Sequence, residues 1–81
     1  MYANIIIDIS HEKLDRTFQY RIPEKLLDQI HPGTPVEIPF GRSNRKIRGY
    51  VVEVTEEPEF APERIKPVSH VIRRVFLLRD S

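Results

Sequence analysis

The sequence has no cysteine, and its three histidines are far apart along the chain. Without cysteine, neither a disulfide nor a thiolate zinc site can hold the fold together, which suits a cytoplasmic protein. His11, His31 and His70 lack the close spacing of metal ligands on one element, so surface or turn positions are the favoured interpretation. We therefore expect neither a metal site nor a cofactor in this chain.

Long apolar runs and catalytic motifs are absent as well. No stretch approaches the roughly 18 to 20 apolar residues of a membrane span, and residues 2–9 are too few and include Asp8. The chain has no glycine-rich phosphate loop, no nucleophile elbow and no spaced carboxylate pair. We expect no membrane association and no enzyme activity in this chain, whose 81 residues suffice for one small domain.

Charge is divided along the chain, although its formal sum is only +1. Residues 42–48 contain four bases and no acid, whereas residues 53–63 contain five glutamates and no base. An unevenly charged, solvated surface explains this division without any ligand. A basic cluster of this size needs further support before it indicates a nucleic-acid site.

Period-two alternation of apolar and polar residues predicts a chain made mainly of strands. In residues 17–22, for example, it puts Phe18, Tyr20 and Ile22 on one face. Residues 2–9, β-branched and with Ile5, Ile7 and Ile9 inward, are a second clear case. The five predicted strands are residues 2–9, 17–22, 36–40, 47–54 and 65–72. This pattern predicts an all-β fold, a small OB-like or SH3-like barrel.

The connections contain one short helix and several turns. Residues 23–30 fit one or two helical turns, which His31-Pro32-Gly33 ends. Residues 55–63 read as a solvated loop in which Phe60 is the one apolar anchor. We place the domain at residues 1–72 and a C-terminal extension, the start of a linker, at residues 73–81.

Two glycines mark special backbone positions. Gly41 ends the strand at residues 36–40 and lets the chain turn where a ligand can approach closely. Gly49 indicates a bulge, a bend or close backbone approach in the next strand. The following Val51-Val52 pair suggests either burial on both faces or a bulge near Gly49.

Several short motifs, in this order and spacing, resemble the N-terminal 3′ DNA-binding domain of the PriA family of bacterial replication-restart helicases. The clearest are Arg16-Thr17-Phe18-Gln19-Tyr20, Val36-Glu37-Ile38-Pro39-Phe40-Gly41 and Ile65-Lys66-Pro67-Val68. The resemblance implies an OB-like module that binds the 3′ end of the nascent leading strand at stalled or branched forks. It places ATP and zinc, helicase activity and contacts with other primosome proteins in the parent protein, in the bacterial cytoplasm at the nucleoid.

Matched position by position, the resemblance implies a DNA 3′-end pocket lined by Phe18, Gln19, Gly41 and Lys66. Relatives commonly carry aspartate where this chain has Gln19. We expect additional phosphate contacts from three bases that follow the glycine, namely Arg42, Arg45 and Lys46.

Each of these residues also has an interpretation that needs no DNA. Phe18 fits a core position as well as a base-stacking wall, Gly41 fits a plain turn, and Lys66 fits a solvated surface. For the chain as a whole, a barrel that docks an acidic protein partner and an RNA-binding barrel both remain alternatives. A preference for strands that carry 2′-hydroxyl groups would indicate the latter.

Overall fold

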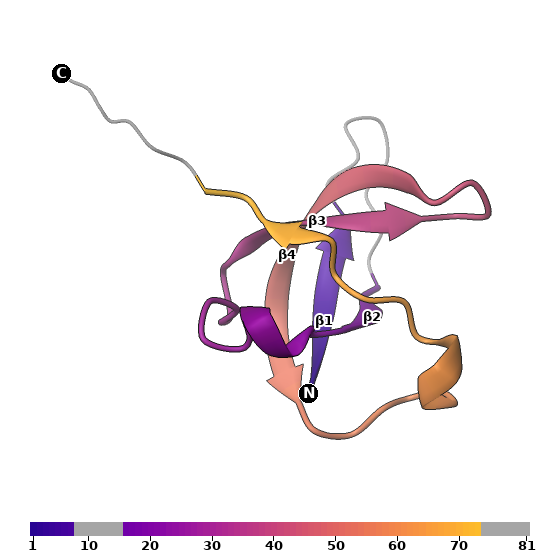
Figure 1. The fold of residues 1–81 in the computed structure, drawn as a ribbon, viewed down its shortest axis with the longest axis horizontal. Coiled ribbons are helices and arrows are strands. Elements are labelled where there is room, and N and C mark those ends of the chain that lie inside the picture. Colours follow the sequence, from indigo (N-terminus) through magenta and orange to yellow (C-terminus); the bar gives the residue numbers. More distant parts are fainter. Residues whose placement is uncertain (8–15, 74–81) are drawn as a thin grey trace, which may run out of the picture.

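Five strands form one antiparallel sheet in the computed structural model, which describes residues 1–7 and 16–73 (Figure 1). The strands lie in the order β2-β1-β4-β3-β5. Their bounds are β1 Tyr2–Ile7, β2 Phe18–Arg21, β3 Pro35–Phe40, β4 Arg45–Thr55 and β5 His70–Val71. The predicted all-β class is confirmed, and because β2 and β5 are the two edges of the sheet, the OB-like barrel is not closed by the described strands. No helix among the described residues is long and apolar enough to cross a membrane.

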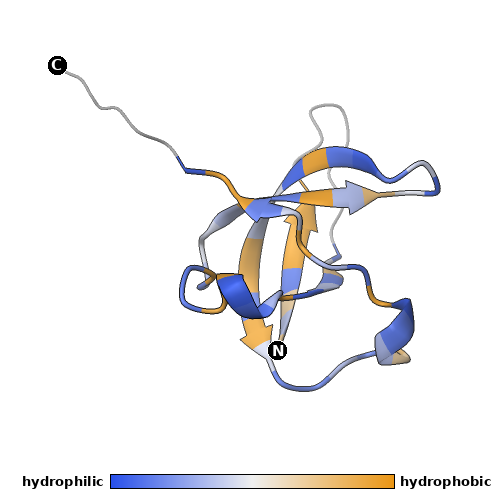
Figure 2. Ribbon diagram, in the orientation of Figure 1, coloured by the Kyte–Doolittle hydropathy of each residue, from blue (hydrophilic) through white to orange (hydrophobic). Residues whose placement is uncertain are grey.

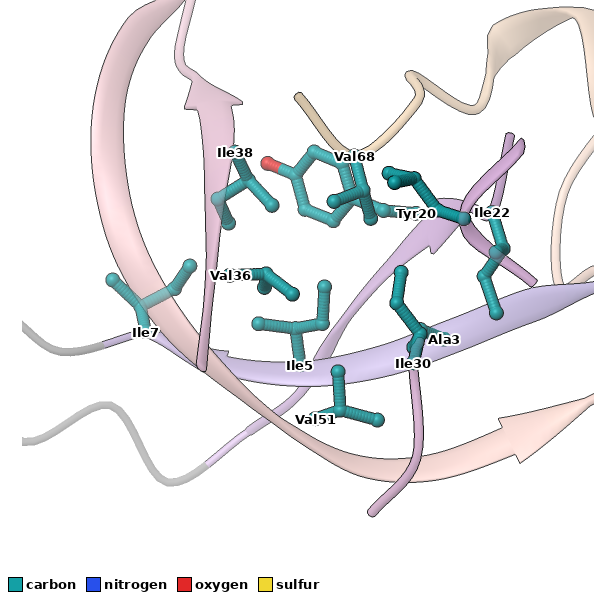
Figure 3. Close-up of a cluster of buried hydrophobic side chains, with 11 residues drawn as sticks. Ala3, Ile5, Ile7, Tyr20, Ile22, Ile30, Val36, Ile38, Val51 and Val68 are labelled. Carbon is teal, nitrogen blue, oxygen red and sulfur yellow. The ribbon is translucent and has the colours of Figure 1, made fainter. Parts of the chain in front are cut away.

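Alternating side chains of β1 to β4 fill the core on one face of the curved sheet (Figure 3). Ile5, Val36, Ile38, Val51 and Val68 are almost completely buried. Burial of each such side chain contributes roughly 1.5 to 3 kcal/mol, so the core accounts for much of the stability of so small a domain. The predicted inward positions in residues 2–7, 17–22 and 36–40 are confirmed, while Asp8, Ile9 and residues 74–81 lie outside the described residues.

Tyr20 connects two strands that are not neighbours in the sheet. Its hydroxyl donates a hydrogen bond of 2.7 Å to the carbonyl of Pro39, so β2 is joined to β3 across the interior (Figure 3). Burial raises the pKa of the Tyr20 phenol, because desolvation disfavours the charged phenolate. The phenol therefore remains a hydrogen-bond donor at neutral pH.

The last segment differs from the single strand predicted over residues 65–72. Pro62–Arg64 forms the 3-10 helix η2, and only His70 and Val71 form a strand, β5, paired with β3. Between them the chain bonds to the other edge of the sheet, where Arg21 N donates to Lys66 O (2.8 Å). Pro67 has no N–H, so a continuous ladder cannot pass through it. As a result this segment hydrogen-bonds to both β2 and β3, which are not paired with each other.

One further detail corrects the sequence prediction, and another decides between two predicted alternatives. The helix expected in residues 23–30 is a single 3-10 turn, η1 at Glu24–Leu26. Val51 is buried but Val52 is 41% exposed, so the pair is not buried on both faces. Asn4 lies opposite Glu53 and Ile5 opposite Val51, which leaves Val52 as the extra residue of a bulge. The predicted alternative, a bulge near Gly49, is therefore confirmed.

Candidate functional site

An open cavity of about 500 Å³ lies where β2, the end of β3 and the segment after η2 meet. Its lining comes from residues 16–20, 40–41, 59–60 and 64–66. In Figure 1 the β3–β4 hairpin and η2 lie on the same side of the molecule, above and below the chain that leads to β5. A volume of this size is typical of small-molecule and nucleotide sites.

The four residues predicted for the pocket all line this one cavity. Phe18 and Gln19 come from β2, Gly41 follows β3, and Lys66 follows η2. Three separate segments of the chain thus bring together residues that the sequence analysis grouped only through a family resemblance. Their contact with DNA remains a prediction.

Phe18 belongs to both the core and the cavity wall. It is partly buried and packs against the core, and its ring meets that of Phe40 edge to face, with centroids 5.3 Å apart. The guanidinium carbon of Arg16 lies 4.6 Å from the centroid of the Phe18 ring, which is cation–π geometry. The two interpretations of Phe18 are therefore compatible.

Lys66 and Gly41 are directly connected. Lys66 Nζ donates a hydrogen bond of 2.8 Å to the carbonyl oxygen of Gly41, which also accepts from Asn44 N in the β3–β4 turn. The ammonium has three donors, so two remain for a ligand. Gly41 has φ +76°, and no atom lies within 4 Å of the place where a Cβ would stand. The turn therefore requires glycine, and the space beside it is open.

Gln19 holds the loop between β4 and η2. Its Nε2 donates to Asn4 Oδ1 (3.2 Å) and to Glu57 O (3.2 Å), and its Oε1 accepts from Glu59 N (2.7 Å). Asn4, itself buried, donates to the Glu53 carboxylate at 3.1 Å. The Gln19 amide thus fastens β2 to the loop that forms one cavity wall, and its oxygen keeps one lone pair for a further donor. Direct bonding from Gln19 to a terminal nucleotide stays a prediction.

The charge around the cavity is mainly positive. Arg16, Arg64 and Lys66 line it together with a single acid, Glu59. Within the described residues, 1–7 and 16–73, no three acidic or histidine side chains lie close enough together to hold a metal ion. The lining therefore favours an anionic ligand over a cation.

The three bases predicted to contact phosphate lie in the β3–β4 hairpin beside Gly41 and do not line the cavity. Figure 2 shows the tip of this hairpin as hydrophilic. Arg45 lies opposite Phe40 and Lys46 opposite Pro39. Because directly paired residues share a face of the sheet, Arg45 is on the face of Phe40 and Lys46 on the reverse face.

Sequence analysis did not assign Arg64 or Phe60 to the cavity. Phe60 was predicted to anchor its loop, which is wrong, because the side chain is 65% exposed and lines the cavity instead. A signal for this was present in the sequence. Phe60 is the only large apolar residue in a loop rich in glutamate and proline, where solvation offers no reason for an aromatic ring.

Comparison with known proteins gives one family. Residues 4–81 match the PriA 3′ DNA-binding domain (3′BD). The chain is 37% identical over 71 residues to the replication restart protein PriA of Bacillus subtilis (strain 168). That alignment covers 88% of this chain and 9% of the relative, so the chain spans about a tenth of the length of the protein that it matches.

Proposed function

Since the chain belongs to the family of PriA 3′ DNA-binding domains, we propose that its cavity binds the 3′-terminal nucleotide of a DNA strand. The observation that carries this proposal is the convergence of Phe18, Gln19, Gly41 and Lys66 on one cavity with a cationic lining. A nucleotide offers what such a cavity can bind, namely a flat base, a sugar with hydroxyl groups and a phosphate.

The terminal sugar is proposed to sit against Gly41, where the missing Cβ leaves room for close approach. Lys66 is held beside it by the Gly41 carbonyl and meets the last phosphate as a point charge. The strand then leaves along the β3–β4 hairpin, where Arg42, Arg45 and Lys46 follow its phosphates. The opposite route runs past the glutamates of residues 53–63 and is disfavoured by repulsion.

The rest of the function belongs to a larger protein. We propose that this domain directs a replication-restart helicase to 3′ ends at stalled or branched forks, in the bacterial cytoplasm at the nucleoid. In this proposal the domain has no catalytic role and no cofactor of its own. ATP, zinc and contacts with other primosome proteins are proposed for the parent protein.

Lys66→Ala tests the phosphate role within this function. We expect weaker binding to single strands of every sequence by about the same factor, because phosphate contacts carry no base information. The slope of log K against log salt should fall by roughly 0.7, the value for one contact to a single strand. Fluorescence anisotropy at several salt concentrations measures both quantities.

Lys25→Ala is the matched control, since it removes an equal charge from an exposed position in η1 that does not line the cavity and has no proposed contact with DNA. If Lys66→Ala leaves the slope unchanged, Lys66 lies outside the binding site. If the two variants change the slope equally, the protein responds to general charge and not to a contact within the cavity.

A further inference from the structure

Phe60 is the most exposed large apolar side chain among the described residues. Its exposure is 65%, whereas Met1, Ile6, Leu27, Tyr50 and Val52 lie between 39% and 44%. An isolated exposed apolar residue is common on protein surfaces and indicates nothing alone. Phe60 differs because it lines the cavity, together with Phe18 and Lys66.

The loop that carries Phe60 is held on both sides of it. Before it, Gln19 bonds to the backbone of Glu57 and Glu59, at 3.2 Å and 2.7 Å. After it, the turn of η2 leads to Ile65, which is buried in the domain. The ring is thus attached to an ordered backbone, so part of the entropic cost of placing it against a ligand is met before binding.

The ring of Phe18, which also lines the cavity, is already engaged. The Phe18 ring has Arg16 over it and the ring of Phe40 against it. Within residues 1–7 and 16–73, neither an aromatic ring nor a cation packs on Phe60 in this way. Phe60 is therefore the cavity aromatic whose face is available to a flat ligand.

We propose that Phe60 stacks on the terminal base of the bound strand, and that Gln19 acts as a positioning residue by holding the Phe60 loop. This inference rests on the proposed function and adds the residue that contacts the base. Stacking accepts any base, because every base has a π face. It follows that the cavity binds 3′ ends of different sequence with similar affinity.

The test compares two short single strands that differ only at the 3′-terminal residue, one with a base and one abasic, and both with a free 3′-hydroxyl. The full chain should bind the strand with the base on the order of tenfold more tightly. Phe60→Ala should bind the two strands equally, and Phe60→Tyr should restore the difference. Val52→Ala, which removes an exposed apolar side chain outside the cavity, should behave as the unmodified chain.

A fluorescent 2-aminopurine at the 3′ terminus gives an independent signal. Its emission should change on binding to the unmodified chain because the base stacks, and the change should be much smaller with Phe60→Ala. If Phe60→Ala retains the full difference between the base and abasic strands, the inference is overturned. The preference for a 3′-hydroxyl over a 3′-phosphate is measured on the same proteins. If the unmodified chain shows no such preference, the proposed function fails, whatever the result for Phe60.

The role of Gln19 is separated by a double variant. Gln19→Ala alone should reduce the difference between the base and abasic strands, whereas Gln19→Ala added to Phe60→Ala should cause no further loss of affinity. A further loss in the double variant would show that Gln19 also acts other than through Phe60, for example by the predicted direct bond to the nucleotide, and would overturn the positioning role.

Discussion

Gly41→Ala is expected to weaken binding of a single-stranded 3′ end on the order of tenfold or more, while Gly33→Ala leaves binding unchanged. The new methyl group would occupy the open space beside Gly41, where the terminal sugar is proposed to sit. Pressing a ligand against an added methyl group costs roughly 1 to 3 kcal/mol, which corresponds to this loss. Anisotropy titration with a 5′-labelled strand measures the effect.

Gly33 is a close match as a control. Both glycines have positive φ, +76° at Gly41 and +97° at Gly33, and a Cβ at either would meet nothing within 4 Å. Only Gly41 lines the cavity. Because both positions have positive φ, each alanine variant should lose about 1 to 2 kcal/mol of stability from backbone strain. If Gly41→Ala loses this stability but binds DNA normally, the glycine serves only the turn.

Gly49→Ala is expected to lower the free energy of unfolding by about 2 to 3 kcal/mol, a large part of the total for a domain of this size. Gly49 lies opposite Ile7 in the β1–β4 pair. A Cβ there would stand 2.5 Å from Ile5 Cγ2 and 2.9 Å from the backbone oxygen of Ile6. Ile5 is fully buried and the Ile6 oxygen belongs to the strand backbone, so moving either one would disrupt core packing or strand pairing.

Urea denaturation of Gly49→Ala beside Gly33→Ala measures this effect. Gly49→Ala should have the lower midpoint, because its cost comes from overlap of atoms, whereas that of Gly33→Ala comes from backbone strain alone. A midpoint for Gly49→Ala equal to that of the unmodified chain would contradict the close approach of β1 to β4.

The strands that alternate clearly were predictable, because their side chains have only one face to bury. Residues 17–22 are the best example, since Tyr20 and Ile22 are buried and Arg21 is exposed between them. The last strand was not predictable in this way. Residues 65–72 have the composition of a strand, but Pro67 cannot donate to a ladder, and the segment bonds first to β2 and then to β3.

The site was only partly predictable. Family motifs placed Phe18 and Lys66, because these residues stand at fixed positions in recognisable sequence. The role of Gln19 depends on Glu57 and Glu59, about 40 residues further along the chain, and no local pattern contains such contacts. Phe60 was predicted to anchor its loop, because an isolated aromatic in a polar loop usually does so, and the structure instead places it at the cavity.

Binding of single strands that end in a 3′-hydroxyl or a 3′-phosphate tests the central claim, that the cavity binds a strand end, most directly. The two strands share sequence, length and 5′ label, and both are titrated into the full chain at one salt concentration. Charge alone would favour the phosphate end, because it adds negative charge near Arg16, Arg64 and Lys66. A terminal sugar seated against the Gly41 backbone, as proposed, leaves too little room for an added phosphate, so we expect the hydroxyl end to be bound at least about tenfold more tightly. Equal affinity, or tighter binding of the phosphate end, would contradict the account.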